Sequence, residues 1–251
     1  MKRLTLNLQN NKKAYFAGDF HLGKSNEYDS NIREKHVVKW LKHIESDAQE
    51  IFLMGDIFDF WFEYKKSVPK GYVRLLGKLA NMSDNKINIH YFLGNHDMWT
   101  INYFENLGIN VYKDPTEFKI DDLRFLIGHG DGLGKGDQSF KFLKGIFRNR
   151  IIQKLFRIIH PDLGISIGNY LSRKKNKKIN NNNSVINDDR IFNYCKNLEI
   201  NNHNDVYVFG HSHKVSERVI NKRSKYYNTG EWISSSNFLV TDCKTFKIKK
   251  F

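Results

Sequence analysis

The chain contains the stretch IFLMGDIFD at residues 51–59, in which four apolar residues lead directly into a glycine and an aspartate. A short, continuous apolar run of this kind is typical of a strand that is buried on both faces of a sheet. The glycine allows a sharp turn where the strand ends, so that Asp56 follows the strand's carboxyl end. The stretch therefore predicts an α/β fold with a polar site at one edge of a sheet.

Four further blocks repeat this plan, and each places metal-binding side chains after an apolar run. They are Gly18-Asp19-Phe20-His21, Gly94-Asn95-His96-Asp97, Gly128-His129-Gly130-Asp131 and Gly210-His211-Ser212-His213. Because strand ends meet at one edge of a sheet, we expect the five distant blocks to converge. As candidate ligands they offer two aspartates, one asparagine and four histidines, which is enough to hold two divalent metal ions side by side.

A site of this composition indicates hydrolysis of a phosphate ester or anhydride. Two divalent ions about 3.5–4 Å apart can neutralise the phosphoryl oxygens, orient the group and activate water. We expect Asp56 to bridge the two ions. Asp19, His21 and one distal histidine would complete one metal site, and Asn95, His129 and the other distal histidine would complete the second. This mixture of oxygen and imidazole ligands suits Mn²⁺, Fe²⁺ or Zn²⁺ better than Ca²⁺.

Four side chains beside the predicted ligands are candidates for supporting roles. His96 would project into the site, where a histidine can bind the phosphoryl group or protonate the leaving oxygen. Asp59, Asp97 and Asp131 can orient the imidazoles of ligands, as carboxylates around metal sites often do. Each of the three aspartates can equally serve as a turn or cap residue, so both readings stay open for them.

The rest of the chain predicts helices and further strands around this edge. Apolar residues at helical spacing predict helices near residues 32–44 and 72–79. The dipeptide Asp121-Asp122 predicts a tight hairpin between strands 117–120 and 123–127. Near the C-terminus, alternating runs predict successive antiparallel strands at residues 215–220, 225–228, 237–241 and 245–249. The simplest assembly is two sheets packed face to face with helices outside.

Residues 137–197 interrupt the alternation of strands and helices. An apolar stripe at helical spacing covers residues 140–159, and Pro161 is expected to end that helix. Residues 137–178 contain eleven Lys and Arg against two Asp. We interpret residues 137–197 as a helical cap inserted into a single domain that spans residues 1–251.

Composition favours anionic partners and a reducing compartment. The 251 residues include 41 Lys and Arg against 27 Asp and Glu, for a net charge of +14. Such an excess attracts nucleic acid, an anionic membrane surface or a phosphorylated substrate, although biased composition would give the same surface. Cys195 and Cys243 suggest no disulfide framework. The sequence has no apolar N-terminal stretch typical of a signal peptide and no run near the ~20 residues of a membrane span, so we expect a cytoplasmic protein.

The five blocks resemble the calcineurin-like metallophosphoesterase family, whose pattern is D-x-H, G-D-x-x-D, G-N-H-D/E, G-H and G-H-x-H. All five occur here in the family's order, between residues 19 and 213. The resemblance implies a four-layer α/β/β/α sandwich and a dinuclear, often manganese, centre. By matching positions it implies two ligand sets, namely Asp19, His21, Asp56 and His213 for one metal, and Asp56, Asn95, His129 and His211 for the other.

Within that family, residues 55–61 (GDIFDFW) resemble the second block of the UDP-2,3-diacylglucosamine diphosphatases of lipid A synthesis. Residues 129–131 followed by Asp137 resemble the same branch, as does a basic, apolar helical insertion. Those enzymes cleave the pyrophosphate of a nucleotide-linked diacyl sugar, giving UMP and a lipid monophosphate. The resemblance implies UDP-2,3-diacylglucosamine as the substrate and peripheral binding at the cytoplasmic face of the inner membrane. Asp137, Arg173 and Lys174 are candidate substrate contacts.

His96 departs from the best-known branch of these diphosphatases, which has arginine after the metal-binding asparagine. Histidine at this position is the general state of the family. Two alternatives therefore remain open. One is a nucleotide or nucleic-acid phosphodiesterase of the same fold, in which the charge of +14 attracts a polyanion. The other is a scaffold without activity, against which the full ligand set argues. The oligomeric state is left open by the sequence.

Overall fold

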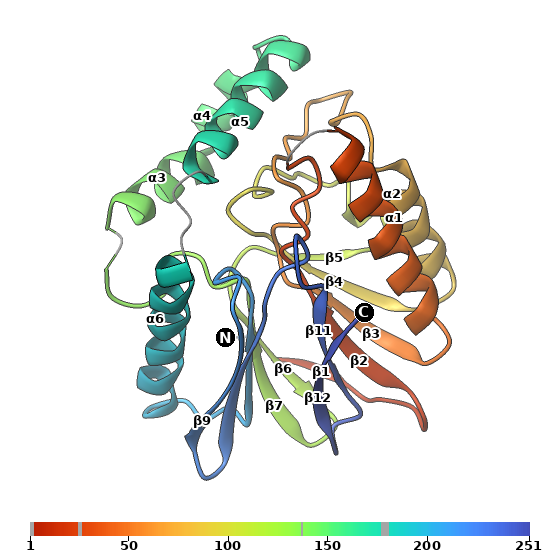
Figure 1. Cartoon of the computed structure of the whole chain (residues 1–251), viewed down its shortest axis with the longest axis vertical. Coiled ribbons are helices and arrows are strands. Elements are labelled where there is room, and N and C mark those ends of the chain that lie inside the picture. Colours follow the sequence, from red (N-terminus) through yellow and green to blue (C-terminus); the bar gives the residue numbers. More distant parts are fainter. Residues whose placement is uncertain (1–2, 25–26, 137, 177–180) are drawn as a thin grey trace.

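The computed structural model of the protein describes residues 3–24, 27–136, 138–176 and 181–251. Two six-stranded sheets pack face to face, and helices cover their outer faces (Figure 1). This is the four-layer α/β/β/α arrangement that the sequence predicted.

The first sheet has the strand order β12-β11-β2-β3-β4-β5. Its strands are β2 (Lys13–Ala17), β3 (Ala48–Leu53), β4 (Asn88–Phe92), β5 (Asn110–Tyr112), β11 (Asn237–Thr241) and β12 (Phe246–Lys250). Strands β2 to β5 run parallel, whereas β11 is antiparallel to both of its neighbours. Helices α1 (Glu27–Ile44) and α2 (Val73–Asp84) cover the outer face of this sheet, and a short 3-10 helix, η1 (Glu105–Leu107), precedes β5.

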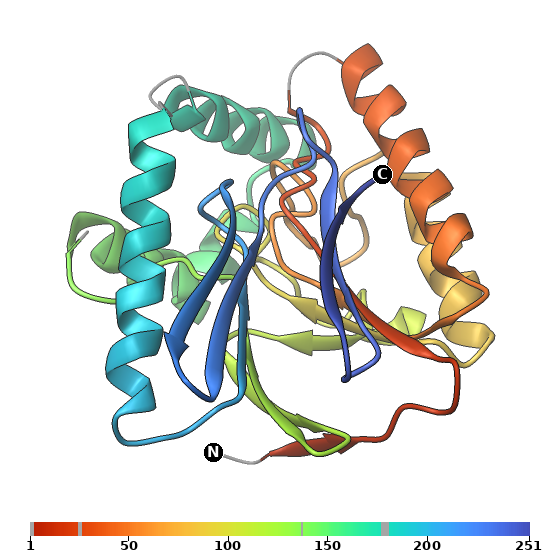
Figure 2. The same ribbon diagram turned by 60° about the horizontal axis from the view of Figure 1, so that its bottom comes forward.

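The second sheet has the strand order β1-β6-β7-β8-β10-β9. Its strands are β1 (Leu4–Leu6), β6 (Thr116–Ile120), β7 (Leu123–Ile127), β8 (Val206–Phe209), β9 (Val215–Asn221) and β10 (Ser224–Thr229). Strand β8 runs parallel to both β7 and β10, while the hairpins β6–β7 and β9–β10 are antiparallel. Helix α6 (Asn181–Glu199) lies along β9 and β10 and covers the outer face (Figure 2).

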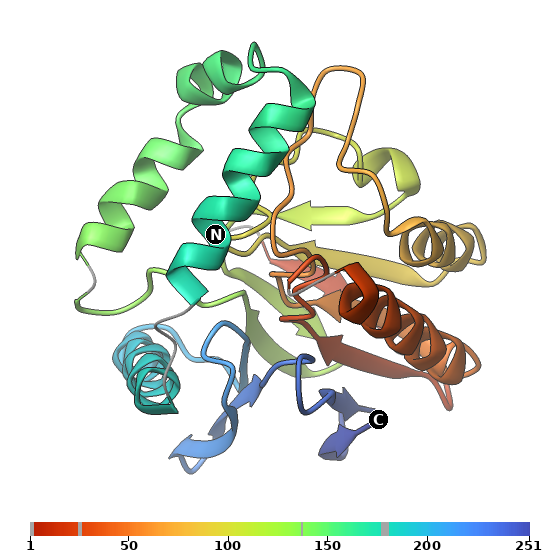
Figure 3. The same ribbon diagram turned by 45° about the horizontal axis from the view of Figure 1, so that its top comes forward.

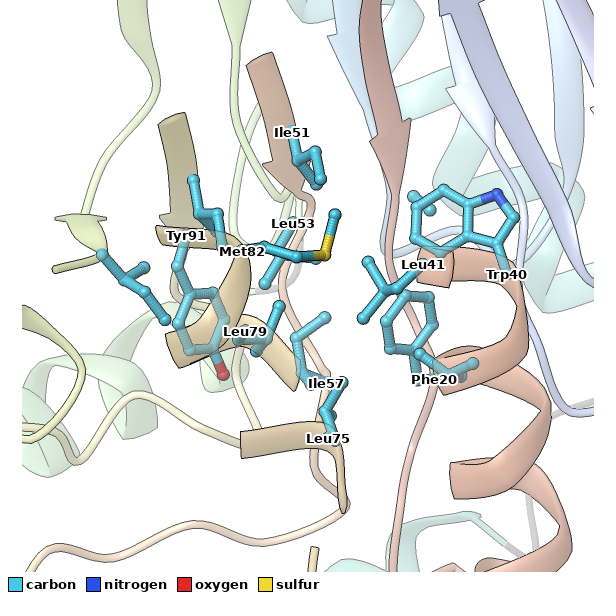
Figure 4. Close-up of a cluster of buried hydrophobic side chains, with 14 of the residues drawn as sticks. Phe20, Trp40, Leu41, Ile51, Leu53, Ile57, Leu75, Leu79, Met82 and Tyr91 are labelled. Carbon is cyan, nitrogen blue, oxygen red and sulfur yellow. The ribbon is translucent and has the colours of Figure 1, made fainter. Parts of the chain in front are cut away.

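Alternation along the strands sorts the apolar side chains into three layers, because successive residues of a strand point to opposite faces. In β3, Phe52 lies between the two sheets and Leu53 lies beneath α1 and α2. In β8, Val208 lies between the sheets and Tyr207 contacts α6. Figure 4 shows the layer beneath α1 and α2, which includes Trp40, Leu41, Leu79 and Met82. Each fully buried large side chain contributes about 1.5–3 kcal/mol, so these layers hold the sheet edges in place.

The predicted hairpin at residues 121–122 is confirmed by the antiparallel pairing of β6 and β7. The prediction of four successive antiparallel strands near the C-terminus is partly wrong. Strands β9 and β10 pair with each other, and β11 pairs with β12, but β10 and β11 belong to different sheets. Alternating side chains indicate an extended strand without indicating which sheet it joins, so residues 230–236 could not be recognised as a crossover.

Three helices lie above the edge of the sheets where the sequence blocks end (Figures 1 and 3). These cap helices are α3 (Gln138–Arg148), α4 (Arg150–Phe156) and α5 (Pro161–Asn176). The single helix expected over residues 140–159 is wrong, because Asn149 ends α3 and caps α4. Its side chain accepts hydrogen bonds from the backbone N–H groups of Ile151 and Ile152. Pro161 begins α5, a position where its missing N–H costs nothing.

The boundaries 137 and 197 of the predicted insertion remain a prediction. Within that range the cap helices lie at the sheet edge, whereas α6 packs along the second sheet. Among the helices of the described ranges, none has both the length and the apolar character needed to cross a bilayer.

Candidate metal centre

The five sequence blocks meet at the carboxyl ends of five strands, where the edges of the two sheets adjoin. The strands and the side chains that follow them are β2 with Asp19 and His21, β3 with Asp56, β4 with Asn95, β7 with His129, and β8 with His211 and His213. Backbone hydrogen bonds fasten the first two loops together, since the N–H of Asp19 donates to Gly55 O and that of His21 to Asp56 O, both at 2.9 Å. The side chains therefore converge from loops that are fixed to each other.

Five of the seven predicted ligands adopt a left-handed backbone conformation. Their φ angles are 52° for Asp19, 45° for His21, 49° for Asp56, 64° for His211 and 60° for His213. A residue with a side chain loses about 1–2 kcal/mol in this region, although aspartate and histidine enter it more readily than most. Such strain persists where surrounding contacts impose it, and it is concentrated at functional sites. Here the hydrogen bonds between loops impose it, and they aim the side chains inwards.

The first cluster of possible ligands consists of Asp19, His21, Asp56 and His213, whose ligand atoms all lie within 4.8 Å of one another. The Nε2 atoms of His21 and His213 are 3.0 Å apart. Two imidazole nitrogens bound to one metal at about 2.0–2.1 Å lie roughly 3.0–3.4 Å apart, so this spacing suits a shared ion. His213 Nε2 is also 3.2 Å from Asp19 Oδ1. The cluster has the size of one coordination sphere.

The second cluster consists of Asp56, His129 and His211, and its ligand atoms also lie within 4.8 Å of one another. His129 Nε2 is 3.4 Å from Asp56 Oδ2. Because Asp56 belongs to both clusters, its carboxylate has the position that a bridging ligand of a two-metal site requires.

Three buried atoms of the predicted ligands support a fit to metal ions. Asn95 Oδ1 has no hydrogen-bond partner within the described ranges, and Asp19 Oδ1 and His129 Nε2 approach only other predicted ligands there. Buried polar atoms are nearly always paired, because an unpaired one costs about 1–3 kcal/mol. Oxygen and imidazole nitrogen atoms are suitable ligands for Mn²⁺, Fe²⁺ or Zn²⁺, so bound cations would supply the missing partners. Assigning the seven residues as ligands remains a prediction.

Hydrogen bonds determine which ring nitrogen of each buried histidine is available to a metal ion. His129 Nδ1 lies 2.7 Å from the carbonyl oxygen of Met54 and therefore donates to it, which leaves Nε2 as the free nitrogen. His21 Nδ1 lies 3.3 Å from Asp59 Oδ1 in the same manner. Outer contacts of this kind orient metal-binding imidazoles. The contact between Asp59 and His21 thus favours the predicted orienting role of Asp59.

The clustered charges shift the pKa values of these groups strongly. Burial opposes protonation of His129, but the adjacent Asp56 carboxylate outweighs it and raises the His129 pKa to about 10. Burial likewise opposes ionisation of Asp56, yet His129 and His96 hold the Asp56 pKa well below its usual value. At His21, burial is the dominant effect and lowers the pKa. A negative field that holds a proton on His129 also attracts a divalent cation, which would displace that proton on binding.

Asp97 and Asp131 contact groups other than imidazoles. Asp97 accepts hydrogen bonds from the backbone N–H of Gly94 at 2.8 Å and from the Tyr91 hydroxyl, so it shapes the loop after β4. Burial raises the pKa of Asp97 to about 6. Asp131 pairs with Lys144 of α3 at 2.6 Å. Of the two readings of these aspartates, the contacts favour a loop role for Asp97 and a link to the cap helices for Asp131.

His96 lies beside both clusters. Its backbone N–H donates to Asp56 Oδ1 at 2.9 Å, and its Nδ1 lies 2.8 Å from the carbonyl oxygen of Asp59. Its ring centroid is 5.0 Å from that of His21. The side chain is 10% exposed, so the ring keeps limited access to a ligand. Contact with a phosphoryl group remains a prediction for His96.

Three residues near the centre were missed by the sequence analysis. Arg33 Nη1 donates to the carbonyl oxygen of His21 at 2.8 Å. Lys24 is half-buried, burial lowers its pKa, and Asp59 counteracts this effect. Ser172 of α5 donates to Asp59 Oδ2 at 2.7 Å. Lys24 could have been suspected from its place just after the first block, whereas Arg33 and Ser172 belong to no recognisable motif.

The predicted substrate contacts cannot be placed around the centre in the same way. Asp137 lies outside the described residues. Arg173 and Lys174 belong to α5, but their side chains lie outside the described part of the structure. The three remain predictions.

Residues 12–215 match the sequence model of the family described as calcineurin-like phosphoesterases. The chain belongs to this family. It is a metallophosphoesterase, a hydrolase whose buried His and Asp clusters can form a dinuclear metal site. The family resemblance inferred from the five sequence blocks is thereby confirmed.

Three similar proteins illustrate the relationship of this calcineurin-like phosphoesterase to known proteins. A UDP-2,3-diacylglucosamine hydrolase of Porphyromonas gingivalis is 30% identical over 94% of this chain and 97% of its own length. The UDP-2,3-diacylglucosamine hydrolase of Psychromonas ingrahamii is 23% identical over 88% of this chain and 89% of its own length. A solved structure of a predicted phosphoesterase from Streptococcus pneumoniae superposes with a TM-score of 0.41 and 13% identity, covering 96% of this chain and 88% of that one.

Proposed function

We propose that this phosphoesterase hydrolyses the pyrophosphate of UDP-2,3-diacylglucosamine, giving UMP and 2,3-diacylglucosamine 1-phosphate in lipid A biosynthesis. The observation that carries the proposal is a candidate dinuclear centre with amphipathic, basic helices docked beside it. The Porphyromonas gingivalis relative supports the same substrate, because the two chains align over nearly their full lengths.

The proposed cofactors are two divalent metal ions, with Mn²⁺ as the native ion. Asp19, His21, Asp56 and His213 would hold one ion, and Asp56, Asn95, His129 and His211 would hold the other. When bound, such a pair neutralises the phosphoryl oxygens and activates water for the attack.

We propose that His96 contacts the phosphoryl group of the substrate. Its Nδ1 is engaged by the Asp59 carbonyl oxygen, so Nε2 is the nitrogen left for a ligand. An Nε2–H at that position can donate a hydrogen bond to a phosphoryl oxygen or a proton to the leaving oxygen. Both roles need the ring to be held in one orientation, for which the Asp59 carbonyl oxygen holds Nδ1 and Asp56 holds the backbone N–H of His96.

The cap helices offer a surface suited to a lipid. Their exposed apolar side chains include Phe142, Ile151, Leu155, Ile158 and Leu163, of which Ile158 is 80% exposed. Exposed apolar side chains with lysine and arginine among them favour acyl chains and anionic headgroups. We therefore propose that this surface binds the acyl part of the substrate and associates peripherally with the cytoplasmic face of the inner membrane.

Aromatic contacts attach the cap helices to the segments that follow the second and third sequence blocks. The Phe156 ring centroid lies 4.7 Å from that of Phe62 and 4.9 Å from that of Trp99. Trp99 Nε1 also donates to the carbonyl oxygen of Phe147 at 2.7 Å. A substrate whose acyl chains lie on the cap helices would consequently have its pyrophosphate close to the candidate metals.

The test is incubation of purified protein with Mn²⁺ and UDP-2,3-diacylglucosamine in detergent, with UMP and the lipid phosphate detected by mass spectrometry. We expect both products from the natural chain and neither from Asp56→Ala. Asp122→Ala is the matched control, because Asp122 is fully exposed on the β6–β7 turn. Turnover of a small aryl phosphodiester without release of UMP would refute the lipid substrate. Cleavage of single-stranded RNA or DNA under the same conditions would instead support the alternative phosphodiesterase function.

A further inference from the structure

Helix α5 approaches the candidate metal centre along one narrow face. Among the residues of α5 whose burial is described, the buried ones are Gly164, Gly168 and Ser172. These residues are four positions apart, so they lie on the same face of the helix. The face is composed of small residues, which lets the backbone of α5 come close to whatever lies beneath it.

The segment beneath this face is the one that follows the second sequence block. A β-carbon added at Gly168 would collide with the ring of Phe60, and one added at Gly164 would collide with the hydroxyl of Tyr64. Ser172 continues the same line and reaches Asp59. The helix and the segment 59–64 therefore pack along each other in register, and this packing fixes how deep Ser172 enters the site.

The Ser172 hydroxyl bridges two groups beside the metal clusters. Its Oγ lies 2.7 Å from Asp59 Oδ2 and donates its proton there, because the carboxylate can only accept. The same Oγ lies 3.1 Å from His96 Nδ1. Since the hydroxyl proton is used at Asp59, the serine oxygen accepts from His96 Nδ1–H, which it shares with the Asp59 carbonyl oxygen. With 9% of its surface exposed, Ser172 makes these contacts largely away from water.

Both partners of Ser172 lead directly to the reacting centre. Asp59 contacts the Nδ1 of His21, a predicted ligand, at 3.3 Å. His96 is the residue proposed to contact the phosphoryl group. A hydrogen bond that holds Nδ1–H of His96 leaves Nε2 for the substrate, and it also prevents the ring from turning over.

We infer that Ser172 is a positioning residue, through which docking of α5 onto the segment 59–64 sets the orientation of His96. The cap helices then contribute to the chemistry of every phosphoester substrate, in addition to any binding of a lipid. The inference rests on the proposed role of His96 and does not depend on the lipid nucleotide being the substrate.

The main experiment measures hydrolysis of bis(p-nitrophenyl) phosphate by the Mn²⁺-loaded full chain. For Ser172→Ala we expect kcat to fall about tenfold or more, the usual cost of removing a residue that orients a metal-site side chain. KM and the bound metal per chain should remain as in the natural protein. Ser172→Thr keeps the hydroxyl and should recover most of kcat. Ser166→Ala is the matched control, because Ser166 lies on the exposed face of the same helix.

A double-mutant cycle separates positioning from a general loss of structure. In a His96→Ala background, Ser172→Ala should cost no further activity, because the group it orients is already absent. Gly168→Val should reproduce the loss of Ser172→Ala by lifting α5 from Phe60, whereas Gly145→Val on α3, where a β-carbon meets nothing within 4 Å, should not. Equal losses from Ser172→Ala in the natural and His96→Ala backgrounds would overturn the inference.

A measurement without substrate distinguishes this inference from the proposed function. In ¹⁵N-histidine spectra of the natural chain, His96 should show a protonated Nδ1, and Ser172→Ala should shift that signal or broaden it. An unchanged His96 signal in Ser172→Ala would refute the positioning role even if the chain cleaved neither substrate. Conversely, hydrolysis of the aryl diester without release of UMP from the lipid nucleotide would refute only the lipid substrate.

Discussion

The candidate metal centre and the cap helices are held by different kinds of contact. The centre consists of largely buried side chains on loops that backbone hydrogen bonds tie together within each sheet, and side-chain contacts such as His129 Nδ1 to Met54 O join the two sheets. The cap helices contact the rest of the described structure through separate points, among them the Lys144–Asp131 ion pair, the Phe156–Phe62 ring contact and the packing of α5 on residues 59–64. The difference suggests that the sheets hold the candidate ligands, whereas the roles proposed for the cap helices depend on separate contacts that can be changed one at a time.

Loss of the shared carboxylate should have the largest effect. Asp56→Ala removes a ligand from both clusters, so we expect turnover of every phosphoester to fall by more than the about 100-fold that loss of an outer contact can cost. Metal analysis of the purified variant should show fewer bound ions than the natural chain. A variant that turns over substrate without metal would refute a metal-dependent reaction at the edges of the sheets.

Removal of the metal should lower the thermal stability of the sheets. Chelation exposes the buried negative charges of Asp19 and Asp56 to one another, and an ion present at 100 times its Kd stabilises the chain by about 2.7 kcal/mol. For a chain of this length that corresponds to roughly 5–10 °C in Tm, which differential scanning calorimetry with Mn²⁺ and with EDTA would measure. No shift in the natural chain, or the same shift in Asp56→Ala, would contradict a metal centre built into the sheet edges.

Negative charges introduced on the exposed face of the cap helices should lower turnover of the lipid substrate but not of a small phosphodiester. Replacing Ile151, Leu155 and Ile158 together by aspartate should lower turnover of UDP-2,3-diacylglucosamine and binding to anionic vesicles about tenfold, because acyl contacts and headgroup attraction are both lost. Hydrolysis of the aryl phosphodiester should stay within about twofold, since Ser172 is untouched. Val219→Asp, on an equally open site of β9, serves as the control. If turnover of both substrates fell equally, these side chains would contribute to the packing of the cap helices and not to lipid binding.

The smallest effect should come from α6, which follows the cap helices in sequence yet belongs with the sheet. Contacts with Tyr207, His203 and Ser224 outweigh burial at Glu199 and lower its pKa from 4.5 to about 2. A carboxyl with a lowered folded pKa stabilises the protein above its unfolded pKa, and that contribution is lost as the pH falls through the folded pKa. Glu199→Gln should therefore cost about 1 kcal/mol at pH 7, as urea unfolding would show. The difference from the natural chain should vanish between pH 4.5 and about 2. A constant difference across that window would mean that the charge of Glu199 contributes nothing.

Much of the centre could be predicted because its residues sit at positions that the strand pattern defines. An apolar run followed by glycine marks a strand end, and Asp19, Asp56 and His129 follow such runs directly. The helix break at Asn149 escaped prediction because the apolar pattern continues through it, and the crossover after β10 escaped because alternation does not indicate which sheet a strand joins. Ser172 was also missed, because its partners Asp59 and His96 are more than 70 residues away in the sequence.

By itself, the sequence determined the family, the order of the strands' polar ends and the set of residue types available to two metals. These depend on local patterns of apolar and polar residues, which are visible in the sequence without knowledge of the fold. Only the tertiary structure decided how five residues are held at positive φ and that a serine of the cap touches His96, and it groups the histidines as the family resemblance implied. Those outcomes depend on distances between loops from different sheets, which packing and interloop hydrogen bonds set and which no local pattern encodes.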